Sequence, residues 1–163
     1  MSGLSGWDNF FIAQVGASAA FAGLVFVGVS INLTKIVAVP RQVGFALEAL
    51  VVLLGVLVAS SLLLVPGQPP ALRGGEVLVV GLAAWLLVSV QQQRTMRALE
   101  RQYRRGYLAA IALGQAATLP FLMAGLALIA RGAGGLYWII PGVICSFLDA
   151  FYLAWVLLIE INR

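Results

Sequence analysis

The segment RTMRALERQYRR, residues 94–105, is the one part of this chain that water rather than lipid would surround. It holds five of the nine arginines, whereas the whole chain of 163 residues is 62% hydrophobic and only 10% charged. The mean hydropathy is +1.02. Because a soluble core of this size could not hide so much apolar sequence, the composition predicts an integral membrane protein.

Five apolar runs flank this segment, three before it and two after it. At about 1.5 Å per residue, helices of this length match a hydrocarbon core of roughly 30 Å. We therefore expect an all-α integral membrane protein in which residues 1–163 form a single transmembrane helical domain. The five expected spans are residues 10–33, 43–65, 74–92, 107–130 and 136–159.

The third run continues into the arginine segment without a glycine or proline that would end a helix. We therefore expect the third helix to extend into the cytoplasm through residue 105. Met96, Leu99 and Tyr103 would form an apolar stripe on this extension. Gly106 would then allow the chain to return to the membrane.

Basic residues fall mainly on one side of the five expected spans, and only Arg73 and Arg131 fall on the other. The positive-inside rule then places the N-terminus outside and the C-terminus in the cytoplasm of a plasma (inner) membrane. This distribution predicts a basic cytoplasmic rim that fixes the topology and attracts anionic lipid. The rim consists of Lys35, Arg41, Arg94, Arg97, Arg101, Arg104 and Arg105.

Several function classes are excluded by composition. The chain has no histidine and one cysteine, Cys145, so the usual zinc, haem and histidine-based catalytic sites cannot form. We expect no enzymatic activity, no cofactor and no metal site. The basic residues that give the net charge of +4 are concentrated on one side of the expected spans, where the positive-inside rule requires them. Nucleic acid is therefore not an expected partner.

The first run carries small and weakly polar residues at helical spacing along one face. This face could line a pore between subunits, or it could pack closely against another helix. Both interpretations stay open. The face consists of Gln14, Ser18, Ala22, Val25, Val29 and Asn32.

Asp149 lies near the middle of the fifth expected span, where a carboxylate is costly and usually faces protein or water. Its expected depth matches that of Thr118, with Gln115 one turn closer to the cytoplasm. These three residues form either an ion or proton site or a structural contact between the fourth and fifth helices. Glu48 is expected near the cytoplasmic interface, in an ion pair at the level of Lys35 and Arg41.

The pattern WDNFFIAQVGASAAFAGLVFVGVSINLTKI, residues 7–36, is followed by the second span and PGQP. Over roughly the first 70 residues the chain resembles a family of small bacterial polytopic proteins sometimes labelled FtsH protease modulators. That resemblance implies no catalytic residues. The run from Ser18 to Ser30 also resembles the pore-lining first helix of Orai calcium channels. It lacks an acidic filter residue at the matching end and would run in the opposite direction, so no selectivity carries over.

Two functions from different classes follow. The first is a homo-oligomeric channel or channel-like ion conduit with the first helix near the oligomer axis, because one protomer has little room for a water path. The second is a non-conducting membrane adaptor or regulatory subunit, for example of a membrane protease. Both use the lipid bilayer as solvent, and both would use the small face of the first helix.

Overall fold

The computed structural model describes residues 6–99 and 104–161. Across these residues the fold is all-helical, which confirms the expected class. Five helices are long: α1 (Asp8–Ile31), α3 (Pro40–Leu63), α4 (Pro70–Ala98), α5 (Arg104–Arg131) and α6 (Ile139–Ile161). Two are short: α2 (Leu33–Val37) and the 3-10 helix η1 (Gly132–Trp138).

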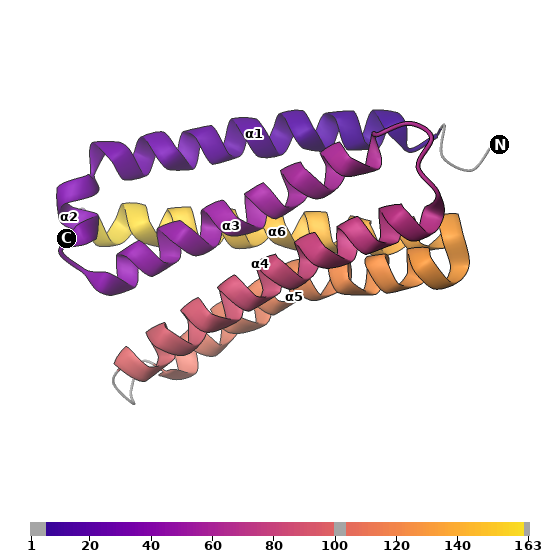
Figure 1. Cartoon of the computed structure of the whole chain (residues 1–163). Helices are drawn as coiled ribbons and strands as arrows, with labels where there is room; N and C mark the ends of the chain where they lie inside the picture. The colour runs from indigo at the N-terminus through magenta and orange to yellow at the C-terminus, as the bar shows by residue number, and fades with distance from the viewer. Residues whose placement is uncertain (1–5, 100–103, 162–163) are drawn as a thin grey trace.

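Local sequence explains where the helices begin and turn. Pro40 and Pro70 open α3 and α4, a position where the missing backbone N–H costs nothing. Gly67 and Gly132 have positive φ angles of 76° and 65°, and each lies in a connection between two long helices. These connections are short, so consecutive long helices run antiparallel and side by side (Figure 1).

Four stretches are long and apolar enough to cross a membrane: Asp8–Ile31, Pro40–Leu63, Pro70–Ala98 and Tyr107–Ile159. The last contains 53 residues and takes in most of α5, all of η1 and most of α6. Each of the five expected spans falls mainly on one long helix, but residues 32–33, 64–65 and 136–138 lie beyond the ends of α1, α3 and α6. The chain therefore has several helices that can span a membrane.

The third helix extends past the expected end of its span at residue 92, as predicted, but it does not continue through residue 105. Helix α4 ends at Ala98, and the backbone of Leu99 is extended, with φ −79° and ψ 135°. Helix α5 then begins at Arg104, before Gly106, so Arg104 and Arg105 belong to the following helix. Because α5 begins before Gly106, it can pair with α4 over more of its length. The expected stripe is therefore not one helical face, and Tyr103 and Arg101 lie outside the described residues.

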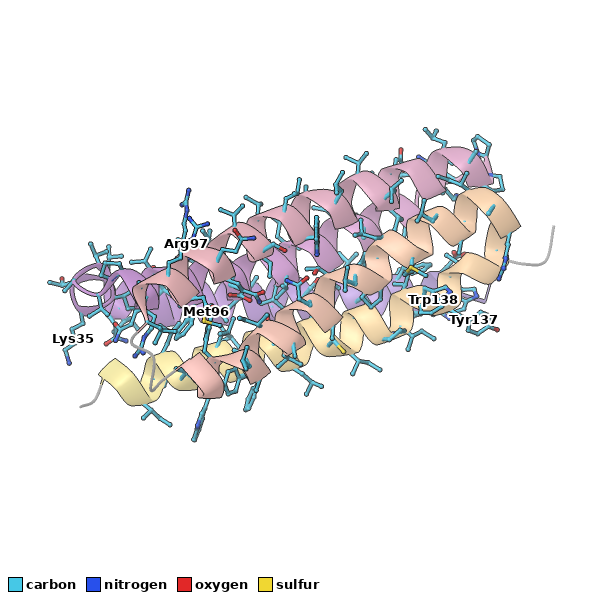
Figure 2. All side chains as sticks on the ribbon, turned by 90° about the horizontal axis from the view of Figure 1, so that it is seen from below. Lys35, Met96, Arg97, Tyr137 and Trp138 are labelled. Atoms are coloured by element: carbon cyan, nitrogen blue, oxygen red, sulfur yellow. The ribbon has the colours of Figure 1, made fainter. Side chains whose placement is uncertain are left out.

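The two ends of the bundle differ in chemistry. Figure 2 shows Lys35 and Arg97 at one end, which we name the basic end, and Tyr137 and Trp138 at the other. We name the second the aromatic end, because the Trp7 ring also lies there, 5.1 Å from the Tyr137 ring between centroids. Such polarity is typical of a helical bundle whose two ends meet different membrane surfaces.

Helix α3 is the centre of the fold, because it packs against α1, α4 and α6 (Figure 1). Two groups of buried apolar residues surround it. The basic-end cluster contains Val25, Phe45, Ala46, Ala49, Val52, Leu53, Val88, Tyr107, Ala110, Ala117, Ala150, Leu153 and Leu157. The aromatic-end cluster contains Phe11, Val56, Ala59, Leu63, Val77, Phe121, Ala124, Leu128, Leu136, Ile139 and Val143.

Helices α4 and α5 approach each other at glycine. A Cβ added to Gly125 would lie 2.7 Å from the backbone nitrogen of Leu78, which is closer than real Cβ atoms come to other atoms. A Cβ added to Gly74 would lie 2.8 Å from the carbonyl oxygen of Gly125. The backbones therefore touch directly, as small residues allow inside membranes.

We expect Gly125→Ala to lower the free energy of unfolding by about 1–3 kcal/mol, because the helix backbones must separate to admit the methyl group. Gly75→Ala on α4 is the matched control, since a Cβ at Gly75 meets nothing within 4 Å. The control should be neutral or stabilising by up to about 1 kcal/mol. Thermal unfolding of both variants in detergent measures the difference, and equal stabilities would contradict the close crossing.

Candidate functional site

Two carboxylic acids lie inside the bundle. Glu48 on α3 is 3% exposed and Asp149 on α6 is 0% exposed. Helices α3 and α6 pack against each other, and the residues that follow the two acids, Ala49 and Ala150, belong to the same buried cluster. Two like charges in an apolar interior repel each other strongly, so ionising both acids at once is costly.

Three hydrogen bonds form a chain that ends on Glu48. Trp85 Nε1 donates to Gln115 Oε1 at 2.8 Å, and Gln115 Nε2 donates to Gln92 Oε1 at 2.9 Å. Gln92 Nε2 then donates to Glu48 Oε1 at 2.6 Å. All three hydrogen bonds are donated in the same direction, from Trp85 towards Glu48. Each bond polarises the next, so the chain favours negative charge on Glu48.

Gly114 on α5 makes room for the end of this chain. A Cβ at this position would lie 2.6 Å from Glu48 Oε1 and would also collide with the amide nitrogen of Gln92. The absence of a side chain lets α5 cover the hydrogen bond between α3 and α4. The bond is thereby shielded from lipid, which strengthens it.

Asp149 has a different environment. Both of its carboxyl oxygens lack a hydrogen-bond partner among the described residues. The hydroxyl groups of Thr118 and Ser146 donate to carbonyl oxygens of α5, to Gly114 at 3.0 Å and to Ala117 at 3.3 Å. Asp149 therefore has no donor to stabilise a negative charge, unlike Glu48.

Among the described residues, no side-chain hydrogen bond joins Asp149 to the other two residues of the expected group, Thr118 and Gln115. Thr118 and Asp149 are both buried, on α5 and α6. Gln115 instead bonds to residues of α4, including Ser89 Oγ at 3.3 Å. The described partner of Glu48 is Gln92 rather than a basic residue, and Glu48 is more deeply buried than expected.

Sequence reasoning missed Trp85 and Gln92 as parts of the site. The available signal is their spacing: Trp85, Ser89 and Gln92 lie at i, i+4 and i+7, on one face of α4. The run of three glutamines at residues 91–93 instead suggested the polar end of a span. Within it Gln92 is buried and Gln93 is exposed.

The face predicted on the first helix packs inside the protomer. Ser18 and Val25 are buried, and Ala22 and Val29 pack against the basic-end cluster. Gln14 and Asn32 are half-buried at intermediate exposure. The structure therefore agrees with the second interpretation, in which this face packs closely against other helices of the same protomer.

The described part of the basic rim gathers at one end. Lys35, Arg94 and Arg97 are exposed and Arg41 is half-buried. The Arg41 guanidinium carbon lies 5.8 Å from the centroid of the Phe45 ring. Arg41 and Arg94 line a crevice of about 690 Å³ between α3 and α4.

No metal-binding group of three or more acidic, histidine or cysteine residues occurs in residues 6–99 and 104–161. No family model, curated protein or solved structure was found to match the chain. The site must therefore be interpreted from its own geometry.

Replacing Gln92 with Leu should lower the free energy of unfolding by about 1.5–3 kcal/mol, because buried Glu48 loses its charge-assisted hydrogen bond. Gln93→Leu is the matched control on the neighbouring, exposed residue. It should change stability by less than about 0.5 kcal/mol. Chemical unfolding in detergent compares the two variants. If Gln92→Leu leaves the free energy of unfolding unchanged, the hydrogen bonds that end on Glu48 do not stabilise the fold.

Proposed function

We propose that the protein is an ion-transporting membrane protein that binds and transfers protons through Glu48 and Asp149. The observation that carries this proposal is the contrast between the two acids. Glu48 accepts the end of a polarised hydrogen-bond chain, whereas both oxygens of buried Asp149 lack a partner among the described residues. The pair lies inside one protomer.

Electrostatics supports a single proton on the two acids. The Gln92 amide donates to Glu48 and stabilises its negative charge, and that charge opposes a second one on Asp149. Asp149 is then the acid that gains and loses a proton. A metal cation fits less well, because Glu48 Oε1 faces an N–H donor and hard cations need several free oxygen ligands.

Access to the pair differs between the two ends. The crevice between α3 and α4 reaches Gly44, one helical turn from Glu48. Towards the other end, the aromatic-end cluster closes the interior with apolar side chains. Proton exchange at the basic end, where the crevice comes closest to Glu48, would require side chains of the basic-end cluster to move, and transfer across the membrane would also require the aromatic-end cluster to move.

We propose five membrane spans, with the basic end in the cytoplasm and the N-terminus outside. Lys35, Arg41, Arg94 and Arg97 at the basic end support this orientation. The aromatic contact between Trp7 and Tyr137 suits the opposite interface. The plasma (inner) membrane is the proposed location.

The small-residue face of α1 no longer supports an axial pore, since it faces the bundle. The outward face of α1 supports the second candidate, a membrane adaptor or regulatory subunit that binds another helix. Gly16, Ala20 and Gly23 lie on this outward face, where a Cβ at either glycine meets nothing within 4 Å. A second copy of the chain fits the same face, as a homo-oligomer requires.

We expect Asp149→Asn to reduce proton flux at least roughly tenfold, because the amide cannot gain and lose the proton. Flux is measured with a pH-sensitive dye in liposomes under an imposed potential, and Glu48→Gln should also reduce it. Glu76→Gln is the control, because Glu76 bonds to Gln68 near the aromatic end and should not affect flux. Size-exclusion profiles verify folding. Wild-type flux equal to that of protein-free liposomes, or full flux in folded Asp149→Asn, would refute the proposal.

A homo-oligomer through α1 predicts that Ala20→Cys, in a Cys145→Ser background, forms a disulfide-linked dimer in the membrane. Leu82→Cys on the exposed side of α4 is the control and should remain monomeric. Non-reducing gels after mild oxidation measure the outcome. If Ala20→Cys cross-links no better than Leu82→Cys, a second copy does not cover this face.

A further inference from the structure

The crevice at the basic end has the composition of an anion site. Its polar lining comes from Arg41 on α3 and from Gln91, Arg94 and Thr95 on α4, and none of the lining residues that the structure describes is acidic. Two positive charges from different helices thus share one crevice of about 690 Å³. Guanidinium groups suit phosphate recognition, because their planar N–H donors match the geometry of phosphate oxygens.

Gly44 forms the inner wall of this crevice. The amide nitrogen of Gln91 lies where a Cβ of Gly44 would be, and Thr95 Oγ1 would lie 3.4 Å from that Cβ. The missing side chain therefore lets both polar groups reach between the helices. Glu48 lies one turn deeper, where its carboxylate accepts the hydrogen bond from Gln92.

Apolar surface continues from the crevice toward the membrane interior. Val43 and Leu47 on α3 and Val90 and Leu87 on α4 are exposed large apolar side chains. They lie within about two turns of the crevice along the same two helices. A ligand with a phosphate and hydrocarbon chains matches this combination, whereas a free phosphate would use only the polar part.

We propose that this crevice binds the phosphate group of an anionic membrane lipid, with Arg41 and Arg94 as its cationic contacts and the acyl chains along α3 and α4. The level of the crevice agrees with this ligand, since headgroups lie where the basic ends of spans meet water. The site does not depend on proton transfer by Glu48 and Asp149.

The test is a titration of the delipidated full chain in detergent with dioctanoyl phosphatidylglycerol, followed by native mass spectrometry. Arg94→Gln and Arg41→Gln should each weaken binding by roughly tenfold, as expected for loss of a charge-assisted contact. Arg97→Gln is the matched control, because Arg97 is exposed on the same helix but does not line the crevice. It should weaken binding less than about threefold.

Two further ligands separate the possible sources of phosphate. Dioctanoyl phosphatidylcholine, which has no net charge, and glycerol 3-phosphate, which has no acyl chain, should both bind at least roughly tenfold more weakly. Equal binding of glycerol 3-phosphate would overturn the assignment to a lipid. Equal losses in Arg97→Gln and Arg94→Gln would overturn the assignment to this crevice and indicate diffuse attraction by the basic end.

Discussion

The hydrogen bond from Gln92 to Glu48, 2.6 Å long, is the contact on which the arrangement of the bundle depends. A carboxylate removed from water needs a donor, and helix α4 supplies it to the central helix α3. The donor is itself fixed by Gln115, so α5 is held in the same arrangement. One buried polar group thus sets the relative positions of three helices.

The same requirement explains where glycine occurs. Apolar helices in lipid gain little from hydrophobic burial, so close packing and internal polar contacts must hold them together. Gly114 lets α5 cover the Gln92–Glu48 bond, and Gly125 brings the backbones of α4 and α5 together nearer the aromatic end. Polar contact and glycine packing therefore act on the same pair of helices at different depths.

Hydropathy predicted the long helices well, because each apolar run must be covered by lipid or by other runs. It could not locate the turn at Leu99, since several polar residues there are equally suited to a helix end. Nor could it predict that Gln92 is buried while Gln93 is exposed. Helical spacing identified the face of α1 that includes Ser18, but only the position of α3 decides whether that face meets a pore or a helix. The burial and the packing partners of individual residues were therefore harder to predict than the positions of the spans.

The crevice and Glu48 lie one helical turn apart, so a bound lipid and a bound proton would affect each other. A lipid phosphate beside Arg94 adds negative charge near Glu48, and this charge makes a second negative charge on the acid pair less favourable. Bound lipid would then favour the form of the pair that holds a proton. By linkage, proton binding would favour bound lipid by the same free energy. The basic end would in this way couple membrane composition to the charge state of the interior, without any contact between lipid and Asp149.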